Sequence, residues 1–333
     1  MQREKYAYNG PILFCEVEAM KIMGPDYYPE FVCIAGECKH TCCAGWEIDV
    51  DEDSFARYQA LEGAVGEKIR SRISTGDEVP HYRMGPGDRC PFLQENGLCE
   101  MILELGEGSL CQICADHPRF RNFFGDRTEI GLGLCCEAAG RLILTREEPV
   151  RLIPVGEEDA PEEEDPEEQA LLSFRDMLFE IMQDRSCTLD QRLDELAETC
   201  GGMRERPISR WAAAFATLER LDEGWTDCLA ALEREDWDEK ALCTPEWDRA
   251  FEQAGVYFLY RHLPAALEDG DVGSKGAFAV LSVKLLRALC AVRLRRTGAV
   301  TPEDLVEYAR MYSGEVEYSE ENLEQIFGWL SFQ

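Results

Sequence analysis

The stretch FVCIAGECKHTCCAGW, residues 31–46, determines how the N-terminal part of this chain is expected to fold. It contains four cysteines, spaced as Cys33-x4-Cys38-x3-Cys42-Cys43. Thiolates a few residues apart on a loop can converge on one ion or cluster without strain. Because adjacent cysteines point in different directions, we expect Cys42 and Cys43 to serve different centres, or only one of them to be a ligand.

Three further groupings of cysteine follow before residue 137: Cys90 with Cys99, Cys111-x2-Cys114, and the pair Cys135-Cys136. The first residues carry mixed charge without the apolar run of a signal peptide, and no stretch is apolar enough to span a membrane. We therefore expect a cytoplasmic protein with no membrane partner. In that reducing compartment, 16 cysteines are not a disulfide scaffold, and clustered thiols usually bind metal or do redox chemistry.

Two kinds of thiolate-held centre are compatible with this pattern, since zinc and iron–sulfur clusters both accept tetrahedral sulfur ligation. Zinc fingers usually show two regular Cys pairs, whereas this chain spreads its thiols over four segments. Iron–sulfur sites often draw on dispersed segments. We therefore favour an iron–sulfur cluster, of the 4Fe-4S kind, and keep zinc as the alternative. Purely structural thiols are a third interpretation, which so many local groupings disfavour.

The fold is expected to be mainly α, with a loop-rich cysteine domain followed by a helical bundle. Residues 1–150 form the predicted metal domain, 151–168 an exposed acidic linker, and 169–333 the helical domain. The apolar spacing predicts helices in these stretches: Asp53–Leu61, Gly66–Ile73, 171–182, Pro207–Leu221, Trp247–Leu267, Ala277–Leu294 and Glu320–Leu330. Thr301 followed by Pro302 is a helix start. Glu129–Leu134 and Arg141–Thr145 are predicted as short strands or extended segments.

Net charge and the positions of the histidines reduce the number of possible functions. The formal net charge is −32 and both halves are acidic, which excludes the basic footprint of a nucleic-acid binder and suits a cationic partner. His40 could be a ligand or a loop residue. His117-Pro118-Arg119 is expected to shape a turn, and His262 to be a solvated or capping residue. No Ser-His-Asp or Cys-His hydrolase arrangement is present, and Gly131-Leu132-Gly133 lacks the setting of a nucleotide loop.

The cysteine segments together resemble the flagellin lysine N-methylase (FliB) family. The similar motifs are Phe31-x-Cys33-x4-Cys38-x3-Cys42-Cys43-x-Gly45-Trp46, Cys90-Pro91-Phe92-Leu93, Leu98-Cys99, Cys114-x2-His117-Pro118-Arg119 and Cys135-x-Glu137-Ala138-Ala139. They are also related to small CxxxCC domains described as zinc- or iron-chelating. The resemblance is strong over about residues 20–150 and weak over the helical remainder.

The resemblance implies methyl transfer from S-adenosylmethionine (SAM) to lysine side chains of a protein, with flagellin as the expected substrate, and an iron–sulfur centre. The cysteines that match the family are the expected metal ligands: Cys33, Cys38, Cys42, Cys43, Cys90, Cys99, Cys114 and Cys135. Cys111 and Cys136 look like extras. Neither the catalytic residues nor the SAM site can be placed from sequence. A non-catalytic metal-binding scaffold and an iron–sulfur redox protein are the alternative functions.

Overall fold

The computed structural model describes residues 20–76, 78–158, 165–204 and 206–331. Its strands are β1 (Met20–Pro25), β2 (Ile73–Ser74), β3 (His81–Tyr82), β4 (Arg119–Phe123), β5 (Arg127–Leu132) and β6 (Leu152–Glu158). The N-terminal helices are α1 (Glu52–Ala60), α2 (Gly63–Ser71), α3 (Glu100–Leu105), α4 (Gln112–Asp116) and α5 (Glu137–Leu144). The C-terminal helices are α6 (Pro166–Gln183), α7 (Leu189–Thr199), α8 (Ile208–Phe215), α9 (Glu223–Arg234), α10 (Pro245–His262), α11 (Ala266–Asp269), α12 (Val272–Thr297), α13 (Pro302–Tyr312) and α14 (Glu320–Ser331). The fold is mainly α, as predicted.

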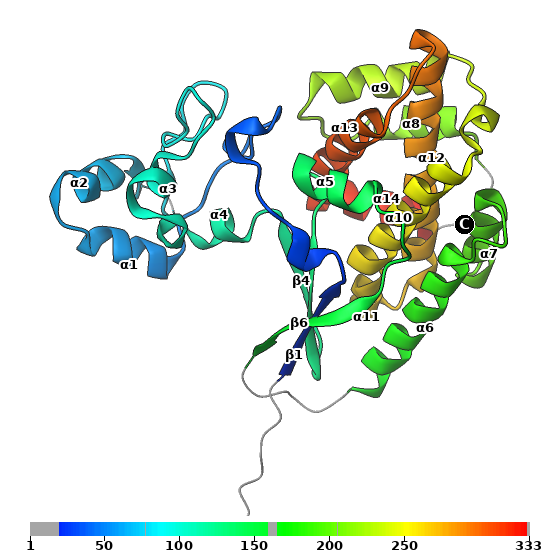
Figure 1. The fold of residues 1–333 in the computed structure, drawn as a ribbon, viewed down its shortest axis with the longest axis horizontal. Helices are drawn as coiled ribbons and strands as arrows, with labels where there is room; N and C mark the ends of the chain where they lie inside the picture. Colours follow the sequence, from blue (N-terminus) through cyan, green and yellow to red (C-terminus); the bar gives the residue numbers. More distant parts are fainter. Residues whose placement is uncertain (1–19, 77, 159–164, 205, 332–333) are drawn as a thin grey trace, which may run out of the picture.

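Two hydrophobic cores organise the molecule. The larger core joins residues of β5, α5 and Tyr27 to the helices that follow residue 165. The smaller core lies in a lobe between Ile48 and Cys111, around Tyr58, Tyr82 and Phe92. In Figure 1 this lobe, which carries α1, α2, α3 and α4, projects from the helical body beside the strands. The packing therefore divides the chain differently from the expected boundary at residue 150.

A four-stranded sheet connects the lobe to the body. Its strand order is β4-β5-β1-β6, with β1 parallel to β5 and antiparallel to β6. β6 occupies part of the segment predicted as an acidic linker, so that prediction was wrong for residues 152–158; residues 159–164 lie outside the described part. β5 confirms the strand expected near Glu129.

The segment Arg141–Thr145, predicted as extended, is largely the end of helix α5. Apolar residues at Ala139, Ile143 and Leu144 face the larger core, and Gly140 lets α5 approach Val306 of α13 closely. A Cβ at Gly140 would lie 3.3 Å from Val306 Cγ1. Helices α13 and α10 cover this apolar face, and both are distant from α5 in the sequence.

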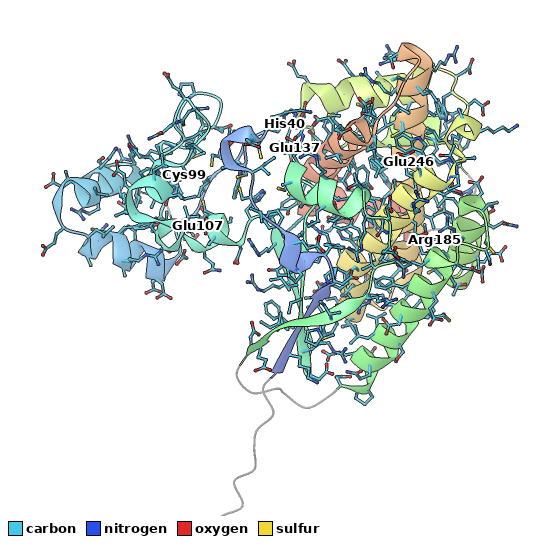
Figure 2. The ribbon with its side chains drawn as sticks, in the orientation of Figure 1. His40, Cys99, Glu107, Glu137, Arg185 and Glu246 are labelled. Carbon is cyan, nitrogen blue, oxygen red and sulfur yellow. The ribbon has the colours of Figure 1, made fainter. Side chains whose placement is uncertain are left out.

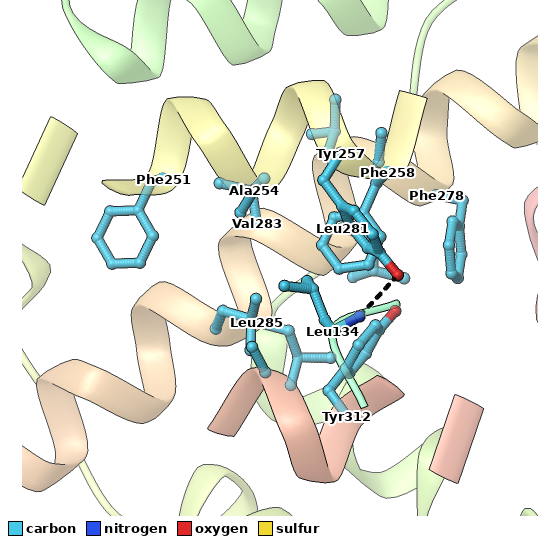
Figure 3. Close-up of a cluster of buried hydrophobic side chains, with 14 of the residues drawn as sticks. Leu134, Phe251, Ala254, Tyr257, Phe258, Phe278, Leu281, Val283, Leu285 and Tyr312 are labelled. Atoms are coloured by element: carbon cyan, nitrogen blue, oxygen red, sulfur yellow. Dashed lines mark hydrogen bonds between the residues drawn. The ribbon is translucent and has the colours of Figure 1, made fainter. Parts of the chain in front are cut away.

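Helix α12 forms the centre of the body and is buried along most of its length. A helix that is apolar all round belongs in a core. It packs against α10 and α14, as the aromatic cluster in Figure 3 shows for α10. The predicted start of α13 is confirmed, because Thr301 and Asp304 form a capping box. In the described part of the chain, no helix has the length and apolarity that a membrane crossing requires.

Candidate functional site

Four thiols from two segments come together at the junction of the lobe and the body, and we call Cys33, Cys38, Cys42 and Cys136 the first thiol group. Burial, together with the neighbouring thiols of Cys136 and Cys33, raises the pKa of Cys38 to about 11. Cys42 and Cys136 are both close enough to Cys33 for its charge to raise their pKa as well. The fold therefore joins the loop at 33–42 to the start of α5.

A second thiol group lies in the lobe and consists of Cys43, Cys90, Cys99, Cys111 and Cys114. Burial raises the pKa of Cys90 to about 12, with contributions from Cys43, Cys99 and Cys111. The Cys114 thiol donates to Cys111, which lowers the pKa of Cys111 to about 7 and raises that of Cys114. Cys43 and Cys90 lie in loops, Cys99 and Cys111 precede α3 and α4, and Cys114 lies within α4, so the lobe's own core positions them.

The adjacent pair Cys42-Cys43 stands between the two groups. The Cys42 thiol donates to Cys43, which raises the pKa of Cys42 and lowers that of Cys43 to about 7. Beyond this contact, Cys42 faces Cys33 and Cys136, whereas Cys43 faces Cys90, Cys99 and Cys114. This placement is consistent with the expectation that the two cysteines serve different centres.

Cys135, which the sequence suggested as a ligand, interacts with Cys136 but with no other thiol of the two groups, and its side chain bonds with Tyr318 near Arg261. Burial raises its pKa to about 12, against the lowering effect of a hydrogen bond with Tyr318 and of the Arg261 charge. Cys136 and Cys111, expected as extras, are inside the groups instead. The other seven predicted ligands fall into one group or the other. Within the described ranges, no three His, Cys, Asp or Glu side chains are already arranged to hold a metal ion. The ligand assignment itself stays a prediction.

Two acidic side chains fix the loop that carries the first thiol group (Figure 2). Glu137, which follows Cys136, accepts from the Lys39 amide at 2.9 Å and from Arg141 at 3.1 Å. Burial alone would raise the pKa of Glu137, but these two donors hold it below its usual value. His40 Nε2 lies 3.1 Å from Glu307 Oε2 of α13. His40 is thus a loop residue paired to the C-terminal helices.

A buried charged network holds the turn before Cys135. Glu317 accepts from the Tyr257 hydroxyl at 3.0 Å and lies 2.6 Å from His262 Nε2. The Leu134 amide donates to the Tyr257 oxygen at 3.2 Å (Figure 3). Arg261 Nε lies 3.4 Å from Glu317. His262 is therefore buried in a network, and the prediction of a solvated or capping residue was wrong.

The ionisation of this network follows from its burial. Burial alone would raise the pKa of Glu317, but the Arg261 charge and the His262 hydrogen bond lower it to about 2. Burial lowers the pKa of His262, so the ring is neutral and donates its N–H to the carboxylate. Glu317 closes a π-helical turn, Ser313–Glu317, a rare geometry that often marks functional sites.

The aromatic residues near the thiols pack against neighbouring side chains and backbone. Trp46 Nε1 donates to the Cys42 carbonyl at 2.8 Å, and Phe92 lies edge-on to Tyr82 in the small core. Arg119 donates to the Tyr28 hydroxyl at 3.0 Å and lies over the Phe31 ring. Gly131 and Gly133 give room for close packing of Phe120 and Tyr318. These two glycines therefore allow close packing of aromatic side chains against β5 and the turn that follows it.

The network residues Glu137, Glu307, Glu317 and Tyr257 were not singled out from the sequence. Glu137 follows a cysteine within the family-like motif, and that position was its only signal. Glu307 and Glu317 are two acids among many in an acidic half of the chain. Only the fold brings them to the thiol loop and to the Cys135 turn.

Among known protein families, one matches the C-terminal part of the chain. Residues 196–333 match the model of the FliB lysine N-methylase C-terminal domain. This match lies in the helical part, where the sequence motifs indicated only a weak resemblance; the stronger resemblance expected over residues 20–150 stays a prediction. No solved structure matches the chain.

Curated proteins of low sequence identity to this chain include lysine-N-methylases and a flagellar protein. The flagellar biosynthetic protein FliU of Salmonella muenchen is 24% identical over 137 residues, which cover 38% of this chain and 79% of FliU. A lysine-N-methylase of Salmonella typhimurium is 23% identical over 137 residues, 38% of this chain and 33% of that protein, and one of Salmonella choleraesuis matches equally. The match thus spans about a third of these two methylases. Residues 196–333 are therefore similar to the C-terminal domain of the FliB lysine N-methylases.

Proposed function

We propose that this protein transfers methyl groups from SAM to lysine side chains of a protein substrate, with flagellin as the expected substrate. The observation that carries the proposal is the match of residues 196–333 to the FliB lysine N-methylase C-terminal domain. Two relatives bear the name lysine-N-methylase and a third is named as a flagellar biosynthetic protein. The acidic chain, with a net charge of −32, suits a lysine-bearing partner.

The proposed reaction is a balanced group transfer. A lysine ammonium loses a proton to solvent or a nearby base, and the neutral amine then attacks the methyl carbon of the sulfonium. The new N–C bond forms as the S–C bond breaks, and S-adenosylhomocysteine leaves as a neutral thioether. Such a displacement needs the amine and the methyl carbon held in line. The protein's task is therefore chiefly to orient two cationic reactants on an acidic surface.

Contacts between the matched domain and the first thiol group support a shared site. His40, in the thiol loop, pairs with Glu307 of α13 at 3.1 Å. Tyr257 and Glu317 hold the Leu134 amide, two residues before Cys136. All three partners in the C-terminal half lie within residues 196–333. The domain that matches the methylases thus contacts the segment that carries the thiols.

The proposed iron–sulfur centre fits the donor set. The first thiol group offers four cysteines and the second offers five, and none of these forms a disulfide. Soft thiolates of this number suit an iron–sulfur cluster or zinc. Bound there, a cluster would staple loop-rich segments together and could exchange electrons. Anaerobic protein analysed for iron, sulfide and zinc, beside its visible spectrum, tests this part; zinc without sulfide would refute the iron–sulfur assignment.

Calorimetric titration of SAM into metal-replete full-length protein tests the enzymatic proposal against a non-catalytic scaffold. We expect saturable binding that S-adenosylhomocysteine competes away, because both share the adenosyl group. Adenosine triphosphate is the matched control, since it has the adenosine but carries anionic charge in place of the sulfonium. No heat of SAM binding at millimolar concentration, with or without a lysine peptide present, would favour the scaffold.

A further inference from the structure

A cavity of about 540 Å³ lies beside the first thiol group, between residues 30–34 and helix α5. Apolar side chains line it, among them Phe31, Val32 and Leu142. Val32 is 73% exposed, although valine has no polar atom that benefits from water. Cys33 of the first thiol group directly follows Val32 in the chain. The cavity thus offers an uncovered apolar surface next to the thiols.

Acidic side chains surround this apolar surface. Glu30, Glu147 and Glu148 line the cavity and are exposed. Within the described part of the chain, the carboxylates of Glu30 and Glu147 form no ion pair. These carboxylates are therefore available to a cation that enters from solvent.

The two arginines of the cavity do not cancel this acidic character. Arg141 Nη2 lies 3.1 Å from Glu137 Oε1, and Arg146 Nη2 lies 2.6 Å from Asp26 Oδ2. Each guanidinium already has its own carboxylate partner outside the cavity's rim. To bind an arginine of the cavity, an anionic ligand would have to displace Glu137 or Asp26 from its ion pair. A cationic ligand meets the carboxylates of Glu30 and Glu147, which form no ion pair in the described part of the chain.

We propose that this cavity binds the lysine-bearing segment of the protein substrate, an inference that rests on the proposed methyl transfer. The methylene chain of the lysine packs on Val32 and Phe31, and its ammonium faces Glu30 and Glu147. Long cationic side chains commonly bury their stems on apolar surface while the charged head stays near water and acids. Arg119 lies over the Phe31 ring and helps to hold it in place.

The position of the cavity fits this occupant. Ala138, which lines it, is two residues from Cys136, so a bound lysine would approach the first thiol group from the α5 side. The opening admits a chain segment rather than only a free small molecule, because Val32 and the acids lie on the surface. SAM is also a cation with an apolar part, so the test must separate the two ligands.

The test measures steady-state methylation of a lysine pentapeptide by the metal-replete full chain, and separately the affinity of that peptide by fluorescence anisotropy. We expect the double variant Glu30→Gln/Glu147→Gln to raise KM and Kd for the peptide about tenfold, because two exposed charge contacts are lost. The value of kcat should stay within about twofold, since binding alone is affected. Val32→Arg should weaken binding at least as much, because it places a cation in the cavity.

Three controls make the outcomes separable. Glu246→Gln removes an exposed acid elsewhere on the body and should leave KM unchanged (Figure 2). A peptide with norleucine in place of lysine keeps the stem without the charge, and its Kd should not respond to Glu30→Gln/Glu147→Gln. Circular dichroism and the thermal midpoint confirm that each variant is folded.

Unchanged peptide KM and Kd in the folded double variant and in Val32→Arg would overturn the proposal even if lysine methylation is active. A rise in the KM for SAM alone would place the donor in the cavity instead and would also overturn it. If wild-type protein binds the peptide through these residues but methylates no lysine, the cavity proposal stands and the proposed function fails.

Discussion

Replacement of Glu317 by Gln should destabilise the whole protein, because this buried carboxylate joins the π-helical turn Ser313–Glu317 to helix α10. Its side chain is fully buried and meets the Tyr257 hydroxyl, His262 and Arg261. Loss of one partner of a buried ion pair costs about 3–5 kcal/mol. The pKa gives a similar size: a fall from 4.5 to about 2 corresponds to about 3 kcal/mol of stabilisation. We therefore expect Glu317→Gln to lower the free energy of unfolding by about 3 kcal/mol.

The lowered pKa of Glu317 makes the stability of the protein depend on pH. Glu317 has a folded pKa below its unfolded value, so its contribution is fully present above about pH 4.5 and is lost as pH falls toward 2. Urea unfolding at pH 7 and pH 3, followed by tryptophan fluorescence, measures both effects. Wild type should lose more stability than Glu317→Gln between these pH values, and Glu246→Gln should behave as wild type. A variant within about 0.5 kcal/mol of wild type at pH 7 would refute the reasoning.

Three further changes test other parts of the account. Thr301→Ala removes the capping box of α13 and should lower the free energy of unfolding by about 1 kcal/mol; equal urea midpoints would count against the cap. Tyr58→Phe deletes the buried 2.6 Å hydrogen bond to the Ser109 carbonyl and should speed amide exchange in the small core, by the equivalent of about 1–3 kcal/mol, whereas unaltered exchange would mean the bond is dispensable. Cys136→Ser should reduce bound iron and Cys135→Ser should not, because only Cys136 lies in the first thiol group; the opposite result would reinstate Cys135 as the ligand.

Much of the helical half could be predicted from sequence, because local signals act there. Thr301-Pro302 begins a helix through capping that involves only neighbouring residues. The apolar stretch 277–294 is long enough to define α12. Helices α7 and α9 were not predicted, although Thr188 and Asp222 cap their starts. Both helices are shorter than α10 and α12, so each offers fewer turns over which an apolar spacing can repeat.

The N-terminal half could be predicted less well, since its order depends on distant contacts. Strand β6 carries acids that suggested a linker, yet pairing with β1 makes it a strand. The end of α5 is apolar enough to pass for a strand, and its contact with α13, beside that with α10, is what makes it a helix. Neither partner is visible from the local sequence.

The thiol groups show the same limit. The sequence indicated a cysteine-built centre and separated Cys42 from Cys43 by their directions. It could not say which cysteine of the pair Cys135-Cys136 faces the 33–42 loop. That choice is made by the turn after Leu134, whose amide is held by Tyr257. The directions of the Cys135 and Cys136 side chains therefore depend on how this turn packs against the folded core.

The most direct test of the central claim is methyl transfer to a lysine. Metal-replete full-length protein, prepared anaerobically, is incubated with methyl-labelled SAM and purified flagellin, and the peptides are mapped by mass spectrometry. The account predicts labelled methyl groups on lysine Nζ, and no label when S-adenosylhomocysteine is in excess or when the lysines have been blocked by acetylation. Intact SAM and unlabelled lysines after prolonged incubation, with flagellin and with the neighbouring proteins of the same cell, would contradict it.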